Sequence, residues 1–263
     1  GLYEGSISEI KAQEVQVPID EEILEDNPSI VSIKFRVRAY RTPFYLEKTL
    51  TLKKDDPKLY VTEKLKNEGY TDKSLMWTHH PTFGGQFLNN STIIDMPKNK
   101  IKYILKPENM GKYDELIAVN IKWPNFKGYS GKKIDFSKFP TIEGENQSID
   151  EVCLGELEEG WYAITNLDKK IGFGMKWDKE IFPYIWIWRM YGKGYKDGPW
   201  WGRVSCMALE LCSSFSTTGL SGAVENNTAL KMKPQQEIET SFIAIAYEKD
   251  GNVRNILKNG DIE

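Results

Sequence analysis

Histidine and cysteine are scarce in this sequence, and long apolar runs are absent. Only two of its 263 residues are histidines. No cysteine or carboxylate cluster has the spacing of metal ligands, so the sequence argues against a metal site. No run of about 18 apolar residues occurs, which is what a membrane-spanning helix needs. Basic residues are not in excess either, since 35 Lys and Arg stand against 38 Asp and Glu. We therefore expect neither a membrane nor a nucleic acid as partner.

The three cysteines are Cys153, Cys206 and Cys212. An odd and sparse set of this kind argues against a disulfide framework and is typical of a reducing compartment. The first five residues, Gly1 to Gly5, do not resemble a signal or transit peptide. These features predict a cytoplasmic protein.

Apolar and polar residues alternate with a period of two along much of the chain. The clearest alternating segments are Ile33–Ala39, Leu59–Leu65, Ile117–Trp123 and Ile243–Tyr247. Each predicts a strand with one buried face, and polar turns separate them, which favours an antiparallel sandwich or barrel. Ser148–Leu157 is the best candidate for a helical turn or two, and residues 127–147 are typical of a loop. No linker or repeat divides the chain, so we predict one domain over residues 1–263.

The two histidines, His79 and His80, are adjacent and precede the Gly84-Gly85 turn. Neighbouring strand residues point to opposite faces, so at most one of the two can face a given site. Pro81 biases His80 towards an extended conformation. One interpretation is a functional imidazole. The other is a strand-end pair, with one ring on the surface and the other bonded to a backbone carbonyl.

A carboxylate, Glu210, falls within an apolar strand pattern. On a strand it shares a face with small or apolar residues: Val204, Cys206, Ala208 and Cys212. Burial in such surroundings raises a carboxyl pKa, which is how a glutamate is tuned as a general acid or base. Alternatively, Glu210 ends the strand and reaches solvent, or pairs with Arg203.

Six of the eight tryptophans lie between Trp161 and Trp201, and Trp186 and Trp188 share one strand face. Flat indole rings bind the apolar C–H faces of sugars, while nearby polar groups bind the hydroxyls. Any single tryptophan could instead belong to the core. A core role is harder to assign to Trp200-Trp201 in the Gly-rich loop 192–202, because loops carry binding groups more often than core. The tryptophans favour carbohydrate binding.

Several segments resemble, in the same order, motifs of the aldose 1-epimerase (galactose mutarotase-like) superfamily. The segments are Arg41–Phe44, Leu50–Leu52, Trp77–Leu88, Thr92–Pro97, Gly172–Asp178, Phe182–Trp188 and Ala208–Glu210. The resemblance spans about residues 1 to 247. It implies an all-β fold, a large antiparallel two-sheet β-sandwich (the supersandwich), with a sugar site on its concave face.

The resemblance also implies an activity, the interconversion of the α and β anomers of a free or phosphorylated aldose. His80 matches the histidine that protonates the ring oxygen, and Glu210 matches the base that takes the proton of the anomeric hydroxyl. Opening a hemiacetal needs one acid and one base, and it needs no cofactor. The candidates for sugar binding are His79, Arg41, Trp177, Asp178, Trp188 and Arg203. His79 is also the fallback for His80, because the doubled histidine leaves the register ambiguous.

The sequence departs from the family at its N-terminal end. In family members a further histidine usually comes from the N-terminal strands. Leu2–Gly5 resembles the family motif that carries this histidine, but it has no histidine itself. This implies an incomplete site, or a chain that starts after those strands. A non-catalytic sugar-binding module of the same fold is therefore the alternative, and a polysaccharide lyase or hydrolase-related domain, with Asp178 as second carboxylate, ranks last. Exposed edge strands would also allow a homodimer.

Overall fold

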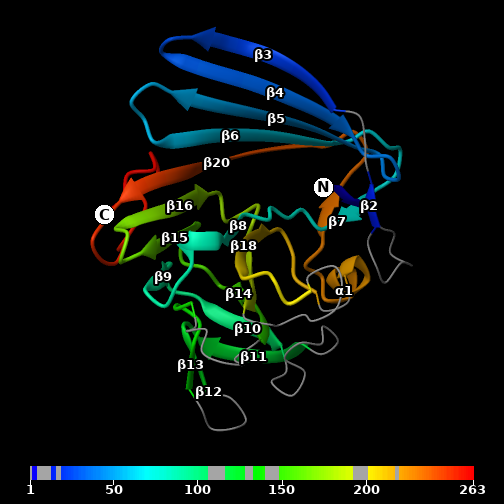
Figure 1. Cartoon of the computed structure of the whole chain (residues 1–263). Helices are drawn as coiled ribbons and strands as arrows, with labels where there is room; N and C mark the ends of the chain where they lie inside the picture. Colours follow the sequence, from blue (N-terminus) through cyan, green and yellow to red (C-terminus); the bar gives the residue numbers. More distant parts are fainter. Residues whose placement is uncertain are drawn as a thin grey trace.

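A computed structural model describes residues 2–4, 13–15, 19–105, 116–127, 133–139, 148–191, 201–216 and 219–263. Within these ranges, two large antiparallel sheets of eight and six strands make up most of the fold, and Figure 1 shows them as an upper and a lower layer. The alternation of apolar and polar residues explains this arrangement, because each sheet has one apolar face to bury.

The larger sheet has the strand order β3-β4-β5-β6-β20-β16-β15-β9. Its strands are β3 (Ile19–Asn27), β4 (Ile30–Arg38), β5 (Phe44–Lys53), β6 (Lys58–Asn67), β20 (Glu237–Glu248), β16 (Ile171–Trp177), β15 (Trp161–Asn166) and β9 (Thr92–Asp95). Strands β3 to β6 are consecutive hairpins. The last strand, β20, joins them to β16 and β15, so early and late strands of the chain share one sheet.

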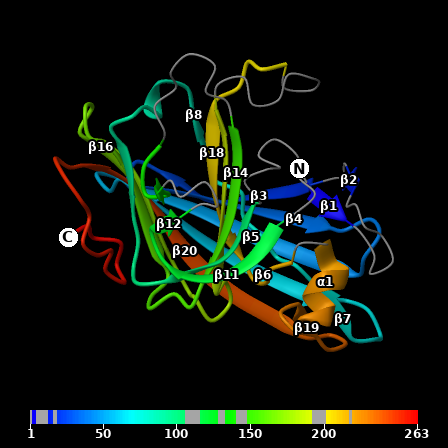
Figure 2. The ribbon, with the colours of Figure 1, turned by 90° about the horizontal axis from the view of Figure 1, so that it is seen from below.

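The smaller sheet has the order β11-β10-β14-β17-β18-β8. Its strands are β11 (Leu116–Lys122), β10 (Lys100–Leu105), β14 (Ser148–Gly155), β17 (Tyr184–Tyr191), β18 (Cys206–Cys212) and β8 (Thr82–Gly84). Figure 2 shows β14 and β18 crossing the long strands of the larger sheet.

Short elements complete the fold. They are the paired strands β1 (Leu2–Glu4) and β2 (Gln13–Val15), β12 (Asn125–Lys127) and β13 (Lys133–Asp135), β19 (Leu230–Met232) and β7 (Lys73–Leu75), the 3-10 turn η1 (Gly85–Phe87) and the helix α1 (Gly219–Glu225). No helix in the described ranges is long and apolar enough to cross a membrane.

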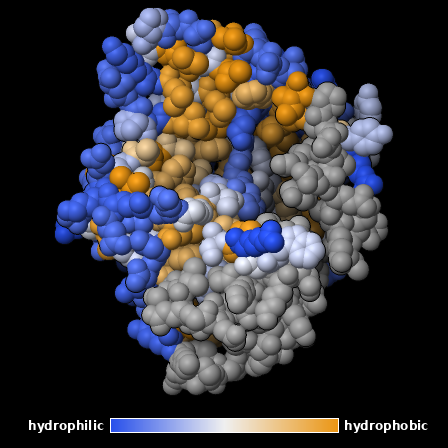
Figure 3. Space-filling model, in the orientation of Figure 1, coloured by the Kyte–Doolittle hydropathy of each residue, from blue (hydrophilic) through white to orange (hydrophobic). Residues whose placement is uncertain are grey.

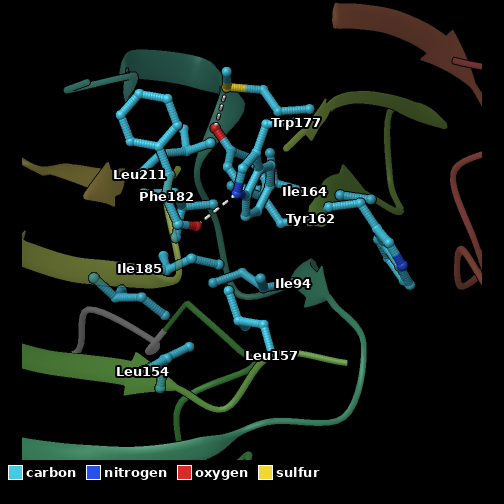
Figure 4. Packing of buried hydrophobic residues seen from close by; sticks show 14 of the residues in the cluster. Ile94, Leu154, Leu157, Tyr162, Ile164, Trp177, Phe182, Ile185 and Leu211 are labelled. Carbon is cyan, nitrogen blue, oxygen red and sulfur yellow. Dashed lines mark hydrogen bonds between the residues drawn. The ribbon is translucent and has the colours of Figure 1, made fainter. Parts of the chain in front are cut away.

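The core lies between the two sheets. Tyr162 and Ile164 enter it from β15 of the larger sheet, and Leu154, Ile185 and Leu211 enter it from three strands of the smaller one (Figure 4). All five side chains are fully buried. The smaller sheet therefore has an inner face packed into this core and an opposite face, which carries the residues considered below.

The apolar face of the larger sheet continues beyond the core onto β3, β4 and β5. Ile19 is 64% exposed and Ile23 is 67% exposed, and Val31 and Leu52 lie in the adjoining strands, also exposed. Figure 3 shows hydrophobic side chains gathered over this upper part of the molecule. We call these four residues the β3–β5 apolar surface.

The predicted sandwich of two large antiparallel sheets is confirmed. Each of the four alternating segments lies within, or overlaps, one of its strands. The predicted helical turn at Ser148–Leu157 is wrong, because these residues form β14 in the middle of the smaller sheet. The loop over residues 127–147 is wrong in part, since β13 pairs with β12. The single domain over residues 1–263 stays a prediction.

Candidate functional site

The segment 77–84, which carries both histidines, runs antiparallel to β18 at the edge of the smaller sheet. The His79 amide donates to the Leu211 carbonyl at 2.9 Å, and the Leu209 amide donates to the Pro81 carbonyl at 3.1 Å. β8 then continues the same pairing. Because side chains alternate along such a segment, the two histidines leave it on opposite faces.

His80 faces Glu210, and the two side chains are in contact. Nε2 of His80 lies 3.1 Å from Oε1 of Glu210. The His80 side chain is 56% exposed and that of Glu210 is 17% exposed, so solvent reaches the pair mainly from the histidine side. Register brings the two catalytic candidates together, because His80 lies beside Glu210 where the segment 77–84 runs along β18. Glu210 does not end the strand in solvent.

Hydrogen bonding around His80 locates its protons. The Thr82 hydroxyl donates to the backbone carbonyl of His80 at 3.2 Å, and its oxygen also lies 2.9 Å from Nδ1. A hydroxyl has one hydrogen, so when Thr82 donates to the carbonyl it accepts from Nδ1. Nε2 and the Glu210 oxygen then need a proton between them, because two acceptors cannot share a contact of 3.1 Å. The His80–Glu210 pair therefore holds a transferable proton.

The charge state of His80 follows from the same contact. The hydrogen bond with Glu210 raises the pKa of His80 above its ordinary value, against the smaller opposing effect of burial. A raised pKa keeps the imidazole protonated nearer to neutral pH, which suits a proton donor.

Two tryptophans of β17 lie on the same face of the smaller sheet as Glu210. Trp186 is directly opposite Glu210, and Trp188 is two residues further on. Trp186 is buried against Cys153 and Cys212. Trp188 is partly exposed, and its ring centre lies 6.4 Å from that of His80. Of the two indoles, Trp188 has the position for stacking on a sugar held at His80.

A second carboxylate, Glu151, lies on this face and was missed in the sequence. It is directly opposite Trp188, with Glu210 two strands away on β18. Burial, and then repulsion from Glu210, raise the pKa of Glu151 to about 7. The face therefore holds a second carboxylate, and its raised pKa is a feature found at acid/base sites. The alternation of Ile149, Glu151 and Cys153 was the signal, but it was masked by reading the segment as helical.

His79 does not belong to this face, so its predicted role in substrate binding or as a fallback acid is corrected. Its side chain points between the sheets and is 12% exposed. Its ring packs 5.1 Å from that of Phe182 and 4.8 Å from that of Phe242. Nε2 lies 3.0 Å from Oε2 of Glu63 on β6. Of the two adjacent histidines, His80 therefore lies at the surface and His79 lies in the interior.

Trp177, a sugar-binding candidate, is a core residue, so that prediction is also corrected. It is 5% exposed, and its indole N–H donates to the Phe182 carbonyl at 2.9 Å (Figure 4). Its neighbour Asp178 is exposed in the turn between β16 and β17, where it accepts from the Glu180 amide. Both residues border an open hollow of about 750 Å³ whose lining does not include His80 or Glu210.

The remaining candidates lie at exposed positions. Arg41 is in the connection between β4 and β5, and Arg203 is in the segment that leads into β18. Trp201 is exposed, whereas residues 192–200, including Trp200, lie outside the described residues. Sugar binding by Arg41 and Arg203 stays a prediction. Across the part of the chain that the structure describes, no group of three or more His, Cys, Asp or Glu side chains could hold a metal ion.

Comparison with solved structures identifies the fold. The chain is similar to a proposed aldose 1-epimerase from Klebsiella pneumoniae subsp. pneumoniae MGH 78578, with a TM-score of 0.61 and 11% identity over 88% of this chain and 54% of that chain. It is similar to a proposed aldose 1-epimerase from Escherichia coli K12, with a TM-score of 0.54 and 14% identity over 87% of this chain and 69% of that one. For a galactose 1-epimerase from Lactobacillus acidophilus NCFM the TM-score is 0.53, with 10% identity over 88% of this chain and 67% of that chain.

These similarities show a galactose mutarotase-like fold, as the sequence motifs predicted. This chain spans about half the length of the Klebsiella protein. No family model matches the sequence, and a search of curated proteins found no match. At such low identity the likeness concerns the fold, and the activity must be argued from the site.

Proposed function

We propose that this chain, which has the galactose mutarotase-like fold, binds an aldose over His80 and Glu210 and interconverts its α and β anomers. The contact of 3.1 Å between His80 Nε2 and Glu210 Oε1 carries the proposal. It places an acid and a base side by side at a surface accessible to solvent, with Trp188 beside them.

The spacing suits the reaction. The ring oxygen O5 and the anomeric oxygen O1 of an aldose are bonded to the same carbon, so the groups that act on them must also be neighbours. In the proposed mechanism, Glu210 takes the proton of the O1 hydroxyl while His80 gives its Nε2 proton to O5. The C1–O5 bond breaks and leaves the open-chain aldehyde. After rotation about C1–C2, the reverse transfers close the ring to the other anomer.

The neighbouring residues have supporting roles in this proposal. Thr82 accepts the Nδ1 proton and so aims Nε2 at the substrate. Trp188 offers an indole face to the C–H side of the sugar ring. Glu151, with its pKa raised to about 7, can donate to or accept from a sugar hydroxyl near neutral pH.

The test is exchange NMR at equilibrium, which follows anomer interconversion for a panel of aldoses and aldose phosphates. We expect His80→Ala and Glu210→Gln each to slow the exchange by about 10²- to 10⁴-fold, the usual effect of removing a general acid or base. Asp261→Asn is the control, because the Asp261 side chain contacts Lys58 and Asn259 and neither His80 nor Glu210. Wild-type exchange rates in both site variants would refute the mechanism.

A non-catalytic sugar-binding module is the alternative, and one observation favours it. His80 and Glu210 satisfy each other directly in the described structure, so a sugar must insert between them before it can react. A binding module would quench or shift tryptophan fluorescence on sugar addition without accelerating exchange. Loss of that fluorescence change in Trp188→Ala, together with uncatalysed exchange in the wild type, would favour this alternative.

A further inference from the structure

We propose that Glu63, on the larger sheet and out of contact with the His80–Glu210 pair, is a positioning residue for His80. It holds His79 between the sheets and thereby fixes the adjoining His80 against Glu210. The inference deepens the proposed function because it concerns the same site. It rests on the His80–Glu210 pair as the reactive pair, but its main readout does not require catalysis.

Backbone hydrogen bonds to β18 hold the segment that carries His80, but on one side only. β8 is only three residues long, and it is the edge strand of the smaller sheet. Pro81 lacks an amide hydrogen and cannot donate to β18. An edge segment is more prone to shift than a central one, and a small rotation would separate His80 from Glu210. A side-chain contact with the other sheet would limit that rotation.

His79 is such an anchor, because it reaches across to the other sheet. Its Nε2 lies 3.0 Å from Oε2 of Glu63. The ring is enclosed by Phe182 at 5.1 Å and Phe242 at 4.8 Å, and Trp77 lies at 6.3 Å, measured between ring centres. The contact thus links the edge of the smaller sheet to β6 in the larger one.

Glu63 is itself held firmly. It is 1% exposed, and its other oxygen, Oε1, lies 2.9 Å from Nζ of Lys48 on the adjoining β5. Neither contact has the angles of a hydrogen bond. The contact with Lys48 joins opposite charges, and the contact with His79 places the carboxylate against a ring nitrogen. Burial acts to raise the pKa of Glu63, but His79 and then Lys48 outweigh it, and the pKa lies below its ordinary value. The carboxylate is therefore charged at neutral pH.

Stability alone does not account for the cluster of Lys48, Glu63 and His79. Burying an ion pair costs desolvation energy, and apolar residues of similar volume are often as stabilising or more so. Phe182 and Phe242 already provide surroundings that would accept such a residue. What the Glu63 contact adds is direction, since a buried carboxylate at a fixed place lies 3.0 Å from the His79 ring nitrogen and thereby sets the orientation of the next residue.

NMR titration of the imidazoles tests the inference, and two histidines give a simple spectrum. His80 faces Glu210 on β18, Thr82 on its own segment and Trp188 on β17. In the wild type its pKa should lie above about 6.5. In Glu63→Gln and in His79→Phe we expect that pKa to fall towards 6.5 as the contact with Glu210 loosens. The anomer exchange rate should fall about tenfold, with the change in kcat rather than KM.

Asp261→Asn is again the matched control, because its partner Lys58 lies on β6, the strand that carries Glu63. It should leave the His80 titration unchanged. His79→Phe replaces one ring by another among aromatic neighbours, so it serves where Glu63→Gln fails to fold. An unchanged His80 pKa in a folded variant of either kind would overturn the inference. A shifted pKa in a protein without anomer exchange would support it and refute the proposed enzyme.

Discussion

Trp177 and Trp188 are alike in the sequence but have different surroundings. Trp177 is enclosed by the core and bonded to the Phe182 carbonyl, whereas Trp188 is partly exposed beside His80. Alternation places a side chain on a strand face, but it does not say whether another layer covers that face. This is why the sequence assigned both tryptophans to sugar binding.

The two tryptophans should therefore respond differently to truncation. Trp177→Ala should lower the free energy of unfolding by roughly 3 to 5 kcal/mol, because it opens a cavity and leaves the Phe182 carbonyl unpaired. Trp188→Ala should change stability by less and abolish the fluorescence response to sugar. Urea denaturation and sugar titration measure the two effects. Equal losses of stability would contradict the difference in burial.

Glu151 should make stability depend on pH. Its folded pKa, raised to about 7, lies above the ordinary value of 4.5. The folded state therefore holds this proton more tightly than the unfolded state does. The contribution is fully present below pH 4.5 and is lost as the pH rises through about 7.

Glu151→Gln should remove this dependence. We expect it to raise the free energy of unfolding at pH 8 by up to roughly 3 kcal/mol, since one pKa unit corresponds to about 1.4 kcal/mol. At pH 4 it should have little effect. Denaturant melts of both proteins at the two pH values provide the measurement, and a gain of equal size at pH 4 would point to packing rather than charge.

At the scale of elements, the sequence predicted strands well where alternation is regular and turns are polar. It failed at β14, where the segment that includes Glu151 and Cys153 was read as helical. That failure also concealed Glu151. The family resemblance assigned His80 and Glu210 to one reaction, whereas their contact follows from the pairing of the segment 77–84 with β18. The inward turn of His79 could not be predicted, because its cause, Glu63, lies on the other sheet.

The contact between β16 and β20 depends on a glycine. A Cβ at Gly172 would overlap the ring of Tyr247, which lies opposite it and bonds to Thr165 at 2.8 Å. Gly172→Ala should therefore displace the ring and lower the free energy of unfolding by about 1 to 3 kcal/mol.

Gly84→Ala in β8 is the comparison for this variant. A Cβ there meets its nearest atom at 3.5 Å, which is ordinary van der Waals contact. Thermal unfolding followed by circular dichroism would compare the two. Similar melting temperatures for both variants would show that Tyr247 moves without cost.

At the scale of the whole molecule, the β3–β5 apolar surface is the largest departure from an ordinary soluble exterior. β3 is an edge strand with Ile19 and Ile23 both exposed, and edge strands of this kind promote association. Its acidic residues, including Glu21, Glu22 and Glu25, oppose pairing with a second β3 through like charge. The homodimer stays a prediction.

A charged side chain introduced on the β3–β5 apolar surface should improve the solubility of the protein. Ile23→Lys should reduce binding of a hydrophobic dye and raise the concentration at which the protein aggregates, with an unchanged circular dichroism spectrum. Val61→Lys is the contrasting variant, because Val61 is buried on the same sheet and its replacement should unfold the protein. Unchanged dye binding in Ile23→Lys would place the dye elsewhere.

All three cysteines are unpaired and buried, and burial raises the pKa of each thiol. The thiolate is the reactive form, so alkylating reagents should reach these positions only when the sheet opens. Cys206 and Cys212 mark the two ends of β18, and Cys153 marks the middle of the sheet. The labelling rates of these cysteines therefore report separately how often the edge and the centre of the smaller sheet open.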